Sequence, residues 1–150
     1  MTELHMLSEL MERVIHKYNQ VENKKRIYGA NVLLTRTEIH TIVAVGEHPG
    51  LNVTELAQKQ GVTKGAASQM IYKLVDKGFI NKTVSPNSDT EVCLMLTEMG
   101  NTAFDEHRKY HESNSNRFFK IIHDMTPELM EQFEYTLKKF DEFLDESLKD

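Results

Sequence analysis

The chain has 150 residues and a net charge of −5, with 39% hydrophobic and 27% charged residues. This length suffices for one core, and the composition excludes an intrinsically disordered protein. A single cysteine excludes an internal disulfide, and neither a secretory pattern nor an apolar run of about 18 residues is present. We therefore expect a cytoplasmic protein that is not integral to a membrane.

The acidic net charge argues at first against nucleic-acid binding, because Lys and Arg make the contacts with phosphates. The distribution of charge reverses this impression. Residues 52–84 carry five lysines and two acids, a local charge of +3, so the remainder of the chain carries −8. The positive charge is thus concentrated in one segment.

The first 50 residues of the chain predict two helices. In residues 4–22 apolar residues recur at spacings of three and four, which indicates an amphipathic helix with one apolar face. Thr35 and Glu38 form a capping pair for a second helix, which ends near Glu47 before the sequence His-Pro-Gly.

Two further helices follow closely. Asn52 and Glu55 repeat the capping pair for a short helix that Gly61 closes. Thr63 then begins a fourth helix, which ends at Gly78.

The remaining elements are a hairpin and two long helices. Residues 79–84 and 91–96 are short β-rich runs on either side of the turn-forming residues 85–90. Thr97 begins a helix that extends to about His123, and the sequence Thr-Pro-Glu at 126–128 begins the last one. A helix-turn-helix followed at once by a hairpin is the arrangement of a winged helix.

The helix from Thr63 has the pattern of a DNA recognition helix, with one apolar face for packing and one polar face for the major groove. The apolar face carries Ala67, Met70, Ile71 and Leu74. The residues predicted to face DNA are Thr63, Lys64, Gly65, Ser68, Gln69 and Lys73. Gln69 suits adenine, whereas the lysines and Ser68 suit phosphate or guanine. A solvated helix face explains any single one of these residues equally well.

The sequence resembles the multiple-antibiotic-resistance regulator (MarR) family in LTRTEIHTIVAV, in NVTELAQKQGVTKGAASQMIYKLVDKGFI and in the wing that leads into LTEMG. This resemblance implies a mainly α, six-helix winged helix-turn-helix protein with a small β-hairpin wing. It implies one domain over residues 1–150, with dimerisation helices at about 1–30 and 98–150 and a winged helix-turn-helix at about 34–97. Such a protein is a homodimeric repressor that reads a palindromic operator in double-stranded DNA.

Apolar faces on both terminal segments fit a homodimer, although packing within one chain remains the alternative. The wing departs from the family pattern. Family members typically carry an arginine at the wing tip. Residues 85–90 contain no basic residue, and Asp89 would repel a phosphate. We expect the wing to contact DNA weakly, or through Asn87, Ser88 and the nearby Lys82.

His107 and His111 are four residues apart on the predicted fifth helix, so their rings project from the same face. This spacing suits two ligands of one metal, but two ligands fill only half of a tetrahedral site. The alternative for these two histidines, taken on their own, is an ordinary solvated helix surface without a metal.

The sequence is also similar to the zinc-responsive branch of the family, the repressors of zinc uptake, through N-Q-x-E, L-T-x-T-x-x-H and E-H-x-x-x-H. This similarity implies a regulatory Zn²⁺ between the first, second and fifth helices, with the ligands Glu22, His40, His107 and His111. Three neutral nitrogens and one carboxylate form a closed set for Zn²⁺. A second site of this branch uses a cysteine and an extra glutamate, where this chain has Tyr28 and Ile39, so that site is not expected.

Two other functions are alternatives to zinc control. In the first, a small aromatic or phenolic effector in the same pocket releases the repressor from DNA, without a metal. The second is an enzyme, which we do not expect because there is no Gly-rich phosphate loop and no nucleophile motif, and a closed metal site leaves no open position. Cys93 lies within the apolar run VCLML and is expected to be buried and inert rather than a redox sensor.

Overall fold

The computed structural model describes residues 3–149, which form six helices and two small antiparallel sheets. In chain order the elements are α1 (Glu3–Glu22), β1 (Arg26–Ile27), β2 (Leu33–Leu34), α2 (Arg36–Glu47), α3 (Val53–Gln60), α4 (Lys64–Asp76), β3 (Ile80–Val84), β4 (Val92–Leu96), α5 (Glu98–Ile122) and α6 (Pro127–Ser147). The predicted fold class, a mainly α winged helix-turn-helix with a small hairpin, is confirmed. The chain divides into two compact units, Met1–Lys109 and Tyr110–Asp150, and the boundary falls within α5.

Capping residues fix the starts of α2 and α3 where the sequence predicts them. At α2 the Thr35 side chain accepts a hydrogen bond from Glu38 N, and the Glu38 carboxylate accepts one from Thr35 N. Asn52 and Glu55 form the same reciprocal pair at α3. Each pair satisfies backbone N–H groups that a helix leaves without partners in its first turn. Gly61 ends α3 in the left-handed conformation, with φ of +64°.

The two-residue strands β1 and β2 were not predicted. They pair Arg26 with Leu34 and Ile27 with Leu33. The connection between them has positive φ at Gly29 and Asn31. Strands of two residues are too short to show an alternating pattern, so hydrophobic periodicity does not indicate this pair of strands.

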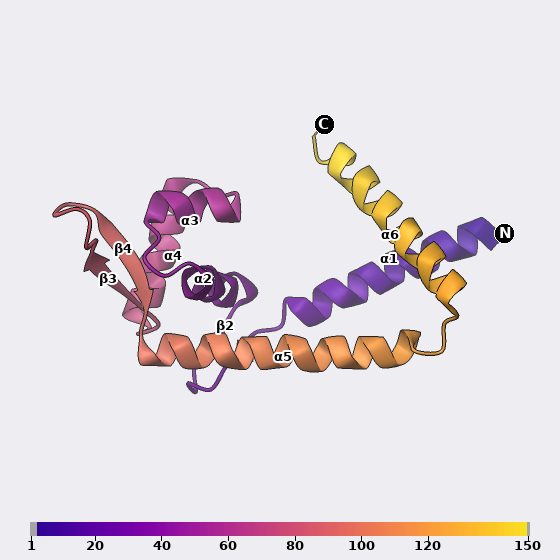
Figure 1. Ribbon diagram of the computed structural model, residues 1–150, viewed down its shortest axis with the longest axis horizontal. Coiled ribbons are helices and arrows are strands. Elements are labelled where there is room, and N and C mark those ends of the chain that lie inside the picture. The colour runs from indigo at the N-terminus through magenta and orange to yellow at the C-terminus, as the bar shows by residue number, and fades with distance from the viewer. Residues whose placement is uncertain (1–2, 150) are drawn as a thin grey trace. The chain divides into compact units, whose positions relative to one another are not determined.

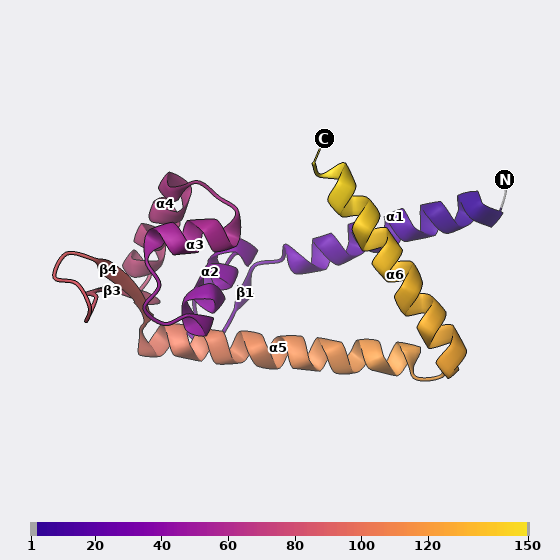
Figure 2. The same ribbon diagram turned by 45° about the horizontal axis from the view of Figure 1, so that its top comes forward.

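The core of the first unit lies among α2, α3, α4 and the β3–β4 hairpin (Figures 1 and 2). Its fully buried side chains include Ile42, Val45, Leu56, Ile71, Leu74, Phe79, Ile80 and Leu94. The hairpin pairs Ile80 with Leu96 and Val84 with Val92. Gly100, in the first turn of α5, packs directly on the base of the hairpin, since a Cβ there would lie 2.1 Å from the carbonyl oxygen of Phe79. This packing joins the start of α5 to the hairpin.

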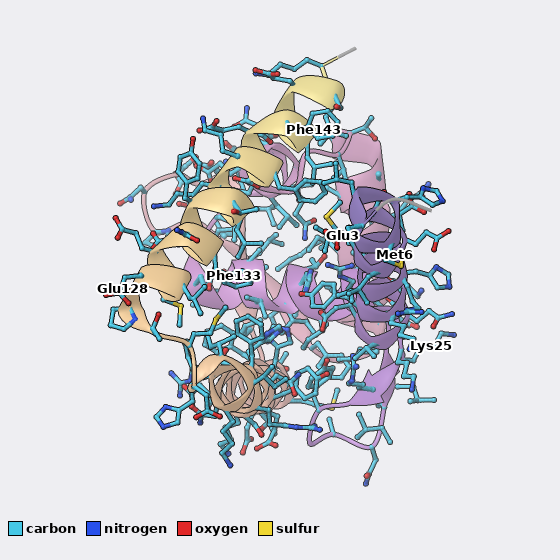
Figure 3. All side chains as sticks on the ribbon, turned by 90° about the vertical axis from the view of Figure 1, so that its right-hand side faces the viewer. Glu3, Met6, Lys25, Glu128, Phe133 and Phe143 are labelled. Atoms are coloured by element: carbon cyan, nitrogen blue, oxygen red, sulfur yellow. The ribbon has the colours of Figure 1, made fainter. Side chains whose placement is uncertain are left out.

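The helices α1 and α6 bury little of their apolar surface. Among the described residues, Glu22 alone is buried in α1 and none is buried in α6. Figure 3 labels Met6 of α1 and Phe143 of α6, both of which are more than half exposed. None of the helices in residues 3–149 is both long enough and apolar enough to span a bilayer.

Candidate functional site

The helix α4 is built as the sequence predicts for a recognition helix. Its N-cap is Thr63, whose hydroxyl accepts a hydrogen bond from Ala66 N at 3.2 Å. Ala67, Ile71 and Leu74 are buried, and Met70 is partly buried against the same core. The apolar side chains thus hold one face of α4 on α2, α3 and the hairpin.

The residues predicted to face DNA all avoid the core. Thr63, Lys64, Gly65, Gln69 and Lys73 are exposed. Ser68 is partly buried, and no heavy atom of another element lies within 4 Å of a Cβ built at Gly65. The first turns of α4 therefore present an open polar surface on which another molecule could approach the backbone closely.

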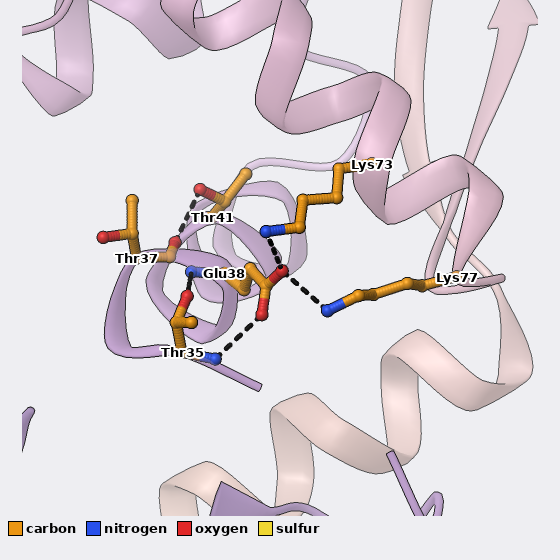
Figure 4. Close-up of polar contacts among 6 residues, drawn as sticks. All are labelled: Thr35, Thr37, Glu38, Thr41, Lys73 and Lys77. Atoms are coloured by element: carbon orange, nitrogen blue, oxygen red, sulfur yellow. Dashed lines mark hydrogen bonds and ion pairs between the residues drawn. The ribbon is translucent and has the colours of Figure 1, made fainter. Parts of the chain in front are cut away.

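Lys73 has a partner within the protein. Its Nζ lies 2.9 Å from Oε1 of Glu38, a residue of α2, although the Lys73 side chain is 54% exposed. Lys77, directly after α4, places its Nζ 2.7 Å from the same oxygen (Figure 4). Sequence analysis identified Glu38 only as a capping residue and Lys73 only as a DNA contact, because ion pairs between distant segments leave no periodic signal.

The Glu38 carboxylate is fully buried and carries a strongly shifted pKa. Burial alone would raise this pKa. Hydrogen bonds from Lys77, the Thr35 backbone and Lys73 outweigh burial and lower the pKa from 4.5 to about 2. Glu38 is therefore ionised at neutral pH and ties α2 to the C-terminal end of α4.

The wing turn is held by its own hydroxyl groups. The Ser88 hydroxyl accepts hydrogen bonds from Thr90 N at 3.4 Å and Glu91 N at 3.3 Å, and Asn87 is exposed. Lys82 of β3 places its Nζ 3.9 Å from the ring centroid of Tyr72, a residue of α4. Sequence analysis missed Tyr72, although its position four residues after Ser68 puts it on the same helix face.

Three of the four predicted zinc ligands lie close together. His40 of α2 and His107 of α5 have ring centroids 5.6 Å apart at an interplanar angle of 82°. His111 is one turn further along α5, and each of the three offers a nitrogen within 4.8 Å of those of the others. His107 is 9% exposed, so this group is partly shielded from water.

Glu22, the fourth predicted ligand, is 8% exposed at the end of α1 and does not belong to this close group. The ring of Tyr28 instead lies beside His107, with centroids 5.6 Å apart and tilted by 56°. An apolar ring next to the histidines limits the access of water on that side.

Cys93 is buried, as predicted, with its Sγ 3.1 Å from Oγ1 of Thr83. The other four histidines, His5, His16, His48 and His123, are exposed. His5 is paired with Glu9 on α1 at 3.3 Å.

Comparison with known proteins gives a consistent picture. Residues 34–92 match the model of the MarR family. The chain is 34% identical over 101 residues to the uncharacterized HTH-type transcriptional regulator YhjH of Bacillus subtilis (strain 168), and this match covers 67% of the chain and 58% of the relative. The chain thus spans less than two thirds of the length of this curated relative.

Two solved structures share the fold along nearly the whole chain. One is FabT of Streptococcus pneumoniae in complex with DNA, with 22% identity, a TM-score of 0.74 and coverage of 96% of this chain and 99% of FabT. The other is ZitR of Lactococcus lactis, a zinc-responsive MarR family member, with 22% identity, a TM-score of 0.73 and coverage of 92% and 99%. Residues 34–92 therefore match the MarR family model, the chain has a winged helix-turn-helix fold, and it is a homologue of HTH-type transcriptional regulators.

Proposed function

We propose that this chain is a transcriptional repressor that binds a palindromic operator as a homodimer and is controlled by Zn²⁺. The observation that carries the DNA-binding part is the open polar face of α4, which a MarR family domain holds on a buried apolar face. The role is regulatory rather than catalytic, in keeping with its homologues.

The residues proposed to contact DNA come from α4 and the wing. Gln69 pairs with adenine in the major groove, and Lys64 contacts phosphate or guanine. Gly65 lets the helix approach the DNA backbone closely. The other proposed contacts to DNA come from Thr63, Ser68, Lys73, Lys82, Asn87 and Ser88.

The homodimer is supported by the exposed apolar side chains of α1 and α6. Leu7, Leu10 and Val14 of α1, with Leu137 and Leu144 of α6, are each more than two fifths exposed. Apolar rows of this kind on both terminal helices fit burial against a second copy of the chain. A twofold dimer would hold two recognition helices about one turn of DNA apart, as a palindrome requires.

Zinc control is supported by the chemistry of the three histidines. Neutral imidazole nitrogens suit Zn²⁺, and the three nitrogens are close enough to bind one ion after small side-chain rotations. Glu22 is the proposed fourth ligand and would have to move toward them. Bound zinc would link α2, which carries His40, to α5, which carries His107 and His111, and could thereby favour one arrangement of the DNA-binding elements.

Control by a phenolic or aromatic effector is the second candidate. A hollow of about 620 Å³ lies between α2 and α3, with Arg36, His40 and Lys59 in its lining. Two basic side chains, Arg36 and Lys59, and one acidic side chain, Glu47, lie beside apolar surface there, a lining that suits a small aromatic ligand with polar groups. The same hollow includes His40, so a metal and an organic effector would act on one helix.

The deciding experiment measures metal content and DNA binding together. The protein is purified without chelator, its zinc content is measured, and its affinity for a duplex selected from a randomised pool is followed during zinc titration. We expect one Zn²⁺ per chain and a change in DNA affinity, with both absent in His107→Ala and kept in the control His123→Ala. DNA binding that ignores zinc but responds to a phenolic compound would support the second candidate instead.

A further inference from the structure

Tyr72 is an exposed aromatic residue on the helix proposed to enter the major groove. It is 67% exposed, and its ring is covered by the ammonium of Lys82, 3.9 Å from the ring centroid. An ammonium within about 6 Å of an aromatic face is attracted to it. The pair links α4 to strand β3 outside the core.

Lys82 is directed toward α4 by the register of the hairpin. Residues two apart in a strand share a face, so Lys82 lies on the side of β3 that also carries the buried Ile80. The cross-strand partner of Lys82 is Leu94, which is buried on this side as well. Lys82 therefore extends beyond the edge of the core to the ring of Tyr72.

Lys82 is also the only basic residue in the hairpin, residues 80–96, where Asp89 and Glu91 are acidic. A wing without a basic residue at its tip has one cation with which to contact a phosphate, and that cation lies in the middle of β3. Tyr72 follows Ser68 by four residues on α4, so the pair borders the polar face proposed to contact DNA.

We infer that Tyr72 is a positioning residue that holds Lys82 beside the recognition helix, where Lys82 contacts a DNA phosphate next to the groove that α4 enters. A lysine has a long and mobile side chain, and the ring restricts its ammonium to one region before DNA arrives. The wing then acts through Lys82 in the middle of β3, and its acidic tip stays away from the phosphates. This inference rests on the proposed DNA-binding function.

The test uses a double-mutant cycle with the full chain. Affinity for the duplex that the wild type selects from a randomised pool is measured over a range of salt concentrations for Lys82→Ala, Tyr72→Leu, Tyr72→Phe and the double variant. Lys139→Ala is the matched control, because Lys139 also lies over a tyrosine, Tyr135, but on α6. Circular dichroism checks that each variant keeps its fold.

We expect Lys82→Ala to weaken DNA binding. It should also reduce the slope of the logarithm of the binding constant against the logarithm of the salt concentration by about one unit per protomer. Tyr72→Leu should weaken binding roughly fivefold or more, because both protomers lose the pair, while Tyr72→Phe and Lys139→Ala stay near the wild type. In the Lys82→Ala background, Tyr72→Leu should add little.

Three results would overturn the inference while the proposed function stands. They are wild-type DNA binding by Tyr72→Leu at every salt concentration, strictly additive effects of the two substitutions, and a Tyr72→Phe variant as weak as Tyr72→Leu. If the wild type selects no duplex at all, the proposed function fails together with the inference.

Discussion

The ammonium of Lys77 lies 2.7 Å from the buried carboxylate of Glu38, so an ion pair joins the end of α4 to the first turn of α2. The same carboxylate accepts a hydrogen bond from Thr35 N and pairs with Lys73. One acidic side chain thus caps α2 and holds α4 at two points. The orientation of the proposed recognition helix depends on this cluster as well as on apolar packing.

Replacing Glu38 with Gln should destabilise the protein by about 3 kcal/mol, the free energy that corresponds to a pKa lowered from 4.5 to about 2. The amide keeps the size of the side chain but leaves two ammonium groups without their counter-charge. Urea unfolding with a chelator present measures the difference. Glu106→Gln removes the exposed pair with Lys109 and is expected to change stability by less than about 1 kcal/mol.

Wild type and Glu38→Gln together also test how the stabilising contribution of Glu38 depends on pH. Because the pKa of Glu38 is lower in the folded than in the unfolded protein, its stabilising contribution is fully present above pH 4.5 and is lost as the pH falls toward 2. The stability difference between wild type and Glu38→Gln should therefore shrink over that range. A difference that stays constant down to pH 2 would contradict the role given to Glu38.

Local signals in the sequence predicted most of the helices and the hairpin, but they did not predict contacts between distant segments. The capping pairs at Thr35 and Asn52 located α2 and α3 because capping is completed within four residues. The contacts of Glu38 with Lys73 and Lys77 connect segments more than 30 residues apart, and no spacing rule indicates them. The histidines were predicted together by resemblance to a family, and three of the four proposed ligands lie together.

Two glycine substitutions should have opposite effects on stability. Gly100→Ala places a methyl group 2.1 Å from the Phe79 carbonyl oxygen, so α5 must shift from the hairpin, at a cost of about 1–3 kcal/mol. Gly65→Ala meets no neighbouring atom within 4 Å and should stabilise α4 by about 0.5 kcal/mol. Thermal unfolding measures both. A Gly100→Ala variant as stable as the wild type would contradict the close packing of α5 on the hairpin.

Gln69→Ala should weaken operator binding by about 1–3 kcal/mol and relax the preference at one base step in each half-site. The exposed amide of Gln69 is proposed to read adenine, whereas Lys64 is proposed to contact phosphate. Lys64→Ala should accordingly make DNA affinity less dependent on salt concentration, without changing the sequence preference. Binding to a set of single-base operator variants separates the two effects, and equal affinity of both variants and wild type would show that α4 does not read DNA.

Charged residues on α6 should disrupt the proposed dimer. Leu137→Glu and Phe140→Glu place carboxylates on its apolar side, and the loss of the dimer should also remove binding to a palindrome, because two half-sites must be held together. Sedimentation measures the oligomeric state. Lys138→Glu changes an exposed polar position of the same helix and should leave the dimer intact. A monomeric wild type at micromolar concentration would refute the dimer.

Zinc should raise the unfolding midpoint of the wild type, since an ion that binds only the folded chain stabilises it by about 2.7 kcal/mol at one hundred times its dissociation constant. His40→Ala should abolish this shift, because only two histidines of the close group then remain.

Glu22→Gln should reduce the zinc-induced shift in the unfolding midpoint if Glu22 moves in as the fourth ligand, whereas Glu12→Gln on the same helix should not. A full shift in Glu22→Gln would mean that zinc is held by three histidines with an open fourth position, and an undiminished shift in His40→Ala would exclude this site altogether.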